Sequence, residues 1–265
     1  MKEIITKYNG GKNGSGTYQQ IKNLIPYHDL YIEGFLGSGA IYRNKKTSSN
    51  SILIDKDHTL INYWEQNHIP EDIFFCMDTI SFIQTCYPLI NLLHNSGTSV
   101  MIYLDPPYPF FTRRSQKKIY KHELTDPEHE KLLIAVCNLN CYVAISSYRN
   151  KMYDQLLRGW NSYEFESQIR IGKSIECIYY NYENPNVLHD YRYIGDNFRE
   201  RELIKGVKKR TINKFMQMSA VQRNYLLTEL MQLLPGSIGK NNDAGPTIKL
   251  AFEAKRVSSH DSAKV

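Results

Sequence analysis

Residues 101–104, Met-Ile-Tyr-Leu, form an apolar run that ends abruptly at Asp105-Pro106-Pro107-Tyr108. A short apolar run of this kind is typical of a buried strand. Two consecutive prolines cannot continue a central strand, because neither has the backbone N–H that the ladder needs. The strand must therefore stop at Asp105. The stop leaves a carboxylate, a rigid carbonyl and an aromatic ring at the strand's carboxyl end, which is where open α/β sheets bind ligands.

These three groups suit a planar ring that carries an amine. Asp105 and the Pro106 carbonyl can each accept a hydrogen bond from one exocyclic NH2 group, while Tyr108 can stack on the ring. Two acceptors directed at one amine leave its lone pair pointing elsewhere, toward an electrophile. Asp-Pro is also a common way to begin a turn, so the motif by itself favours a strand-ending turn. Its place after an apolar strand and downstream of a glycine motif favours a functional site.

The glycine motif follows an earlier predicted strand at residues 29–33. Residues 34–40 read Gly-Phe-Leu-Gly-Ser-Gly-Ala, and a helix is expected to begin there. Glycines after a strand let the backbone approach a ligand closely, and a helix N-terminus favours polar or anionic groups. This pattern indicates the nucleotide-binding turn of a Rossmann-like unit. The strict G-x-G-x-x-G spacing of dinucleotide-binding proteins is absent, which argues against a dinucleotide.

Together the two motifs resemble those of the Dam-type, or alpha-group, DNA adenine-N6 methyltransferases, which use S-adenosylmethionine. Residues 33–39 are similar to the family's donor-binding motif, with Gly34 in place of its usual proline, and Asp-Pro-Pro-Tyr is its catalytic motif. Residues 8–12, Tyr-Asn-Gly-Gly-Lys, are similar to its N-terminal motif. The resemblance covers about residues 5–183. It implies an α/β fold, a Rossmann-like class I methyltransferase sheet with helices on both faces.

The resemblance also implies the site residues. Asp55 ends a predicted strand at residues 51–55 and is the expected acceptor for the donor's ribose hydroxyls, with Asp57 as its rival. Asp78 is the candidate contact to the donor's adenine if residues 73–78 are a strand rather than part of a helix. Asp105, Pro106 and Tyr108 are the candidate catalytic residues. The full set implied to bind S-adenosylmethionine is Tyr8, Lys12, Glu33, Phe35, Gly37, Gly39, Asp55, Asp78 and Asp105.

The implied reaction is methyl transfer to the exocyclic amine of an adenine flipped out of double-stranded DNA. It needs no metal and no covalent protein nucleophile. Methylation of cytosine at N4 is an alternative, and so is a DNA-binding regulator that has lost activity. A cognate restriction endonuclease is a further candidate partner. The sequence does not reveal the target site or the oligomeric state.

This sequence has no room for the insert through which Dam-type enzymes recognise DNA, so other segments must contact the DNA. Dam-type enzymes carry a target-recognition insert between the two motifs, whereas here Gly39 and Asp105 are only 66 residues apart. Two basic segments are candidates, although either could also be a solvated surface: a flap beside the catalytic motif and a helix within residues 198–214. Their candidate DNA-binding residues are Arg113, Arg114, Lys117 and Lys118 in the flap, and Lys205, Lys208, Lys209 and Arg210 in the helix.

We expect three regions: a catalytic domain at 1–186, a small basic helical C-terminal appendage at 187–234 and a flexible tail at 235–265. The net charge of +6 is compatible with a polyanionic partner. Five scattered cysteines without a C-x-x-C pair predict neither disulfides nor zinc. The sequence has no apolar run of about 18 residues, so no membrane span is expected. The N-terminal residues lack a signal-peptide core, so a cytoplasmic location is expected.

Overall fold

The structure is a computed structural model, and it describes residues 11–12, 16–67, 72–113, 117–168 and 172–233 of the 265-residue chain. Tyr8, Arg114 and the predicted tail at 235–265 lie outside the described residues. Within the described ranges, no helix is long and apolar enough to cross a membrane.

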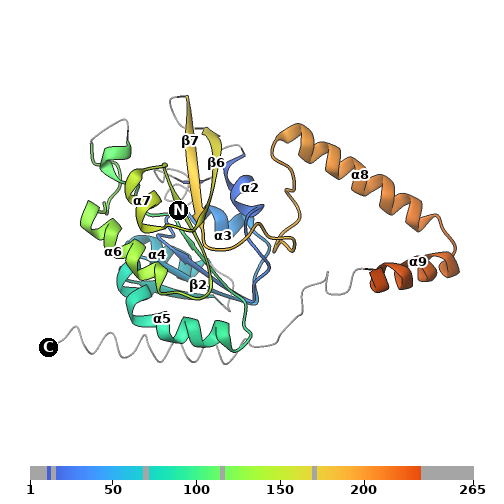
Figure 1. The fold of residues 1–265 in the computed structure, drawn as a ribbon, viewed down its shortest axis with the longest axis horizontal. Helices are drawn as coiled ribbons and strands as arrows, with labels where there is room; N and C mark the ends of the chain where they lie inside the picture. The colour runs from blue at the N-terminus through green and yellow to red at the C-terminus, as the bar shows by residue number, and fades with distance from the viewer. Residues whose placement is uncertain (1–10, 13–15, 68–71, 114–116, 169–171, 234–265) are drawn as a thin grey trace.

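One seven-stranded sheet forms the centre of the described part, with the strand order β3-β2-β1-β4-β5-β7-β6 (Figure 1). The first five strands are parallel, while β7 runs antiparallel to β5 and pairs with β6. This is the Rossmann-like sheet of class I methyltransferases, and it confirms the predicted fold class. The strands are β1 (Leu30–Gly34), β2 (Asn50–Asp55), β3 (Ile73–Cys76), β4 (Val100–Leu104), β5 (Tyr142–Ser147), β6 (Asn161–Gln168) and β7 (Lys173–Tyr180).

Helices cover both faces of this sheet (Figure 1). The longest helices are α5 and the two helices of the C-terminal region. Asp78 is the N-cap residue of α5. The helices are α2 (Thr17–Lys22), α3 (Ala40–Asn44), α4 (His58–Gln66), α5 (Thr79–Asn95), α6 (Asp126–Cys137), α7 (Lys151–Leu156), α8 (Phe198–Met216) and α9 (Ala220–Leu233), with a 3-10 turn η1 (Phe110–Thr112).

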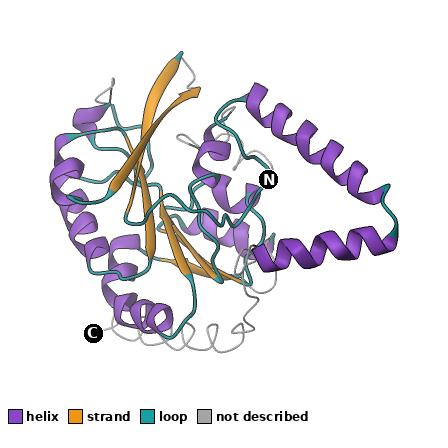
Figure 2. Cartoon of the chain, turned by 45° about the vertical axis from the view of Figure 1, so that its right-hand side comes forward, coloured by secondary structure: helices purple, strands orange, loops and turns teal. Residues whose placement is uncertain are grey.

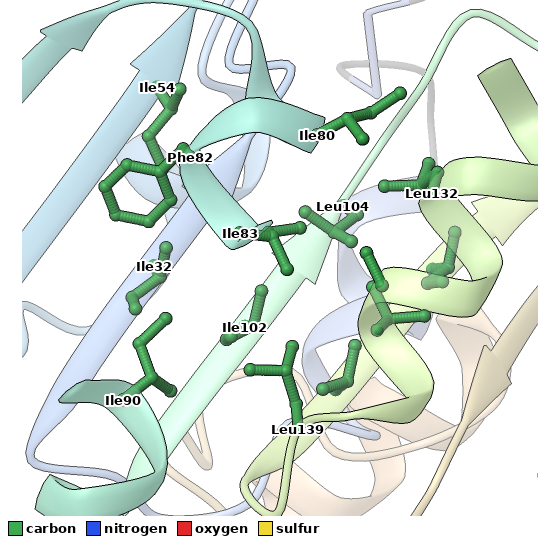
Figure 3. Close-up of a cluster of buried hydrophobic side chains, with 14 of the residues drawn as sticks. Ile32, Ile54, Ile80, Phe82, Ile83, Ile90, Ile102, Leu104, Leu132 and Leu139 are labelled. Atoms are coloured by element: carbon green, nitrogen blue, oxygen red, sulfur yellow. The ribbon is translucent and has the colours of Figure 1, made fainter. Parts of the chain in front are cut away.

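The alternation of side chains along each strand divides the core into two layers. On one face, Ile32 and Ile102 pack with Phe82 of α5 and Leu132 of α6 (Figure 3). On the other face, Tyr31, Met101 and Tyr103 pack with residues of α2 and α3. Both faces of the central strands are therefore buried, which explains why these strands are apolar without interruption.

The register of the parallel strands brings their carboxyl ends to one edge. Gly34 at the end of β1 pairs with Ile54 of β2 on one side and with Leu104 of β4 on the other. The strand order changes direction between β1 and β4, because β2 and β3 lie on one side and β5 on the other. This switch point is where open α/β sheets place ligand sites. The glycine motif and Asp105 both follow strands that end there.

Two elements differ from the sequence-based expectation. The sequence does not predict β6, because its residues Asn-Ser-Tyr-Glu-Phe-Glu-Ser-Gln alternate polar side chains with aromatic ones and lack an apolar run. It is an edge strand, and an edge strand can present polar side chains to water. Cys137 and Cys141 lie four residues apart in an apolar, helix-like stretch, a spacing that predicts core packing for both. Cys141 is buried, but Cys137 is exposed, so the prediction is wrong for Cys137.

The C-terminal region expected to be helical contains α8 and α9. They project from the rest of the described protein as an arm (Figures 1 and 2). None of their residues is buried, and several large apolar side chains on both helices are exposed. The arm therefore contributes little to the core of the sheet domain.

Candidate active site

A cavity lies at the carboxyl edge of the sheet, over the ends of β1, β2 and β4. It contains about 840 Å³ of empty space, open solvent included. Residues from both sequence motifs line it, together with residues of the flap after β4. The predicted site residues that line this cavity are Lys12, Glu33, Phe35, Gly37, Asp55, Asp78, Asp105 and Pro106.

The turn after β1 is under unusual backbone constraint. Phe35 has a φ of 57°, a left-handed conformation that a residue with a bulky side chain adopts rarely. Its N–H donates to Thr79 Oγ1 at 3.2 Å. A Cβ added to Gly34 would lie 2.4 Å from Thr79 Cγ2 and 2.8 Å from Leu104 Cδ2. This crowding explains why glycine stands here where the resembling family has proline.

The two candidate acids after β2 have different partners. Asp55 lines the cavity, and its carboxylate accepts hydrogen bonds from the N–H groups of Gly37 and Asp57, both at 2.8 Å. Burial raises the pKa of Asp55, while these two N–H groups oppose the rise. Asp57 instead caps α4 through the N–H of Thr59 at 3.0 Å and pairs with Lys121 at 2.7 Å. The geometry therefore favours Asp55 over Asp57 as the residue that can reach a ligand.

Gly39 and Asp78 hold different positions relative to the cavity. Gly39 is the N-cap residue of α3 with a φ of 57°, and an added Cβ would lie 2.7 Å from Cζ2 of Trp64. It is not among the described residues that line the cavity, so its predicted contact with the donor remains a prediction. Asp78 does line the cavity, although one of its oxygens also accepts from the N–H of Ser81 at 2.9 Å.

Glu33 is the acid buried beneath the cavity. One of its oxygens accepts from the hydroxyl of Tyr31 at 2.7 Å and from the N–H of Tyr42 at 3.0 Å. Burial raises the pKa of Glu33 to about 8, and the hydrogen bond from Tyr31 opposes this rise. The side chain is therefore protonated at neutral pH when no cation is beside it. Glu33, at the floor of the site, can therefore become negatively charged when a cation binds beside it.

A buried charged cluster lies at the catalytic motif. The ammonium of Lys12 is 2.8 Å from Oδ1 of Asp105, 2.8 Å from the Tyr108 hydroxyl and 3.4 Å from Oε2 of Glu176. The Tyr108 hydroxyl donates to the same Glu176 oxygen at 2.9 Å. Two carboxylates thus share one cation, with the tyrosine hydroxyl between them. Such a buried set is stable when each member has a partner.

The pKa values follow from this arrangement. Burial raises the pKa of Asp105 to about 6; Lys12 opposes the rise and the negative charge of Glu176 adds to it. Burial alone would lower the pKa of Lys12, but Asp105 and Glu176 outweigh it and hold that pKa above its ordinary value. Although burial acts in the opposite direction, Lys12 and the hydroxyl donors keep the pKa of Glu176 low. Asp105 is therefore the carboxylate of this cluster whose protonation can change near neutral pH.

Glu176 was missed by the sequence analysis. It lies in β7, far along the chain from the catalytic motif, and the β6–β7 hairpin brings it to the Tyr108 hydroxyl. One signal was present in the sequence: Glu176 is an acid directly before the apolar run Cys-Ile-Tyr-Tyr at residues 177–180. A buried carboxylate in such a strand needs a partner, which can point to a site.

Arg113 makes contacts that differ from the predicted phosphate contact. Its Nε donates to the backbone oxygen of Tyr108 at 2.6 Å, and its two terminal nitrogens donate to Glu123 at 3.0 and 2.6 Å. The guanidinium also lies 4.5 Å from the ring centroid of Phe110 and 5.0 Å from that of Tyr120. Arg113 is 9% exposed. Its role in the structure is to tie the flap to the catalytic turn rather than to face DNA.

The other candidate DNA-binding residues lie on the surface. Lys117 and Lys118 are exposed in the flap. Lys205, Lys208, Lys209 and Arg210 are exposed on α8, and Lys205 pairs with Glu202 at 2.7 Å.

A second cavity lies on the other side of the catalytic motif. It contains about 1220 Å³ of empty space, open solvent included, and Tyr108 lines it. Tyr120 lines both cavities. Tyr148 packs edge-to-face on Tyr108 with ring centroids 4.7 Å apart. This second cavity therefore offers aromatic rings next to Asp105, which suits a planar ligand.

No protein-family model matches the chain, and no curated protein matches it in sequence. Among solved structures, the chain is similar to the N-methyltransferase NodS from Bradyrhizobium japonicum, with 12% identity over 63% of this chain and 94% of that chain and a TM-score of 0.41. A putative RNA methyltransferase from Pyrococcus horikoshii has 12% identity over 68% of this chain and 94% of that chain, with a TM-score of 0.39. TrmK from M. capricolum, solved with S-adenosyl-homocysteine, has 7% identity over 82% and 94%, with a TM-score of 0.39.

The strand order and the turn after β1 define a protein with the class I methyltransferase fold. Likeness at the identities and TM-scores above says nothing about the substrate of this chain. What the chain binds must be argued from its own site residues.

Proposed function

We propose that the protein transfers a methyl group from S-adenosylmethionine to the exocyclic amine of an adenine extruded from DNA. One observation carries the proposal: Asp105 and Pro106 line the same cavity as Gly37 and Asp55, so an amine at the catalytic motif would face a ligand held by the glycine turn. The resemblance of both motifs to the Dam-type enzymes supplies the identities of the donor and the base.

The donor half of the cavity suits S-adenosylmethionine. Asp55 can accept hydrogen bonds from ribose hydroxyls, and Gly37 lets the backbone approach closely. Glu33 and Asp78 place acidic groups in the same cavity, where a cationic ligand would be stabilised. When bound, the donor supplies an electrophilic methyl group on a sulfonium. The residues named here bind and orient that molecule.

The acceptor half lies at Asp105, Pro106 and Tyr108. The Asp105 carboxylate and the Pro106 carbonyl each accept a hydrogen bond from one N–H of the target amine, and this directs the amine's lone pair toward the donor half. Tyr108 and the aromatic cavity beside it hold the ring. Because Lys12 already contacts Oδ1 of Asp105, the incoming amine must share or replace that contact. Glu176 remains as a partner for Lys12 when this happens.

The base must leave the duplex for its amine to reach this buried motif. The exposed Lys117 and Lys118 of the flap lie after the catalytic turn, where they can contact phosphates near the extruded nucleotide. Arg113 supports this function indirectly, because its bonds to Glu123 and to the Tyr108 backbone hold the flap in place.

The test is to express the chain in a host that lacks adenine methylation and to analyse the nucleosides of its DNA by mass spectrometry. The proposal expects N6-methyladenine in the presence of the wild-type chain and none with Asp105→Ala. N4-methylcytosine would keep the mechanism and change the base. If purified protein binds S-adenosylmethionine but modifies no DNA, the chain is a binding protein rather than this enzyme.

A further inference from the structure

A large groove lies at the base of the α8 arm. It contains about 1960 Å³ of empty space, open solvent included. One wall is the first half of α8, and the other is formed by the segments before β1 and β2 together with residues 187–194. The isolated bridge between Pro26 and Leu188 holds the last of these segments against the sheet domain. The groove therefore lies between the arm and the rest of the described protein.

Basic residues greatly outnumber acidic ones in the lining of the groove. Among the described residues that line it, six are basic and one, Asp190, is acidic. Asp190 is buried and already pairs with Lys22 and Arg192, so it repels a negatively charged ligand only weakly. Burial lowers the pKa of Lys45 to about 7, which leaves the other basic groups to carry most of the positive charge. These are Lys46, Arg201, Lys205 and Lys208, because Arg192 pairs with Asp190.

The groove and the candidate active site lie at opposite edges of the sheet. Tyr27 comes just before β1, and Lys45 and Lys46 come before β2, so the groove is at the amino ends of the parallel strands. Asp105 follows the carboxyl end of β4. Strands of this length at about 3.3 Å per residue separate the two edges by roughly 15–20 Å.

We propose that this groove binds the phosphate backbone of the DNA substrate at a distance from the methylated base. The choice of DNA rests on the proposed function; the charge of the groove requires a polyanion of some kind. With about 3.4 Å per base pair along each strand, the separation corresponds to roughly five or six base pairs. The groove therefore contacts phosphates outside the segment that the catalytic motif and the flap can reach.

This inference divides the basic residues of α8 into two classes. Lys205 and Lys208 line the groove, whereas Lys209 and Arg210 do not. The exposed pair between Lys205 and Glu202 does not prevent phosphate binding, because exposed ion pairs are weak. The two pairs of residues carry the same charge on the same helix, so each is a matched control for the other.

The experiment compares Lys205→Ala/Lys208→Ala with Lys209→Ala/Arg210→Ala in the full chain. Binding to a fluorescent duplex of about 30 base pairs is measured by anisotropy across a range of salt concentrations. The groove variant is expected to bind more weakly and to lower the slope of log K against log salt by up to about 1.8, or about 0.9 for each phosphate that is no longer neutralised. The control variant should change the slope by less than half as much. Alanine favours helix, so α8 is retained in both, as circular dichroism will show.

Equal effects of the two double variants would overturn the proposal, because they would indicate a general effect of charge rather than a groove. No effect of the groove variant would also overturn it. Tighter binding of duplex RNA than of duplex DNA by the wild type, with the same response to the groove variant, would overturn the choice of DNA. Because the assay needs no methyl transfer, a protein that binds DNA through the groove but modifies none would refute the proposed function and leave this inference intact.

Duplex length gives a second, independent measurement. If the groove contacts phosphates beyond the target region, the groove variant should raise KM for methylation of a duplex of about 30 base pairs. The KM for methylation of a duplex of about 10 base pairs should not change. The kcat value should be the same on both, because no groove residue reaches the catalytic motif. An equal rise of KM on both lengths would place these contacts near the target and overturn the remote location.

Discussion

The ammonium of Lys12 lies 2.8 Å from Oδ1 of Asp105, so the candidate catalytic carboxylate is ion-paired before any target amine arrives. The same ammonium is 3.4 Å from Glu176, which gives Lys12 a second anionic partner. A buried carboxylate without a cation more readily takes up a proton, which turns one oxygen into a donor and makes the group a weaker hydrogen-bond acceptor. Lys12 therefore keeps Asp105 in its accepting form while the site is empty.

Asp105→Ala should abolish methyl transfer and leave the fold intact. The variant removes one of the two acceptors that orient the amine, while the cavity residues Asp55 and Gly37 are untouched. Transfer of a radiolabelled methyl group to DNA measures the activity, and calorimetry measures binding of S-adenosylmethionine. Activity within about tenfold of the wild type, a change of about 1.4 kcal/mol in the barrier, would contradict the assignment.

Asp55→Ala should weaken donor binding, whereas Asp57→Ala should affect stability instead. Loss of a charged acceptor for ribose hydroxyls is worth about 1.5–3 kcal/mol, or about 10- to 150-fold in Kd. Asp57 caps α4, so its loss should lower the free energy of unfolding by about 1 kcal/mol with little change in Kd. Calorimetry and urea unfolding on both variants separate the two effects. The opposite pattern in Kd would mean that Asp57 is the ribose acceptor.

The value of kcat/KM should fall as the pH drops through about 6. Asp105 has its pKa raised to about 6 by burial, and its protonated form is a weaker acceptor for the hydrogen bond that the amine donates to it. Activity is therefore present above this pH and declines by up to about tenfold per unit below it, since kcat/KM reports the ionisation of the free enzyme. A profile that is flat between pH 5 and 7 would show that Asp105 does not titrate in this range.

Glu176→Gln should move this acidic decline to lower pH. The negative charge of Glu176 raises the pKa of Asp105, so its removal lowers that pKa. Glutamine can still accept the hydrogen bond from the Tyr108 hydroxyl, which keeps the ring in place. Glu166→Gln, an exposed change on the same hairpin, is the matched control and should leave the profile where it is. An identical profile for both variants would mean that Glu176 does not act on Asp105.

Glu33→Gln should change how stability depends on pH. The pKa of Glu33 is about 8 in the folded protein, against an ordinary value of 4.5, so the folded state binds one more proton between these values. The free energy of unfolding of the wild type therefore decreases as the pH rises through this window. The glutamine variant lacks this proton and should gain stability relative to the wild type at pH 8 compared with pH 5. Urea unfolding at the two pH values measures the difference, and an equal difference at both would contradict the raised pKa.

The structure of the two contiguous motifs could be predicted from the sequence, because it depends on residues that are neighbours in the chain. Two prolines stop a strand wherever they occur, so the end of β4 at Leu104 and the position of Asp105 at the sheet edge could be predicted. The apolar strands and the glycine turn likewise predicted the Rossmann-like sheet and the cavity over it. β6 escaped prediction because an edge strand needs no apolar run.

The partners of the charged groups were decided only by the tertiary structure. Glu176 reaches the Tyr108 hydroxyl because β7 inserts between β5 and β6, and no spacing along the chain reveals that pairing. Arg113 reads as an exposed cation in the sequence, but Glu123 folds back to bind it. Asp55 lines the cavity, whereas Asp57 caps α4 and pairs with Lys121. Local backbone chemistry is set by neighbours in the chain, whereas charge pairing depends on which distant segments the fold brings within about 3 Å of each other.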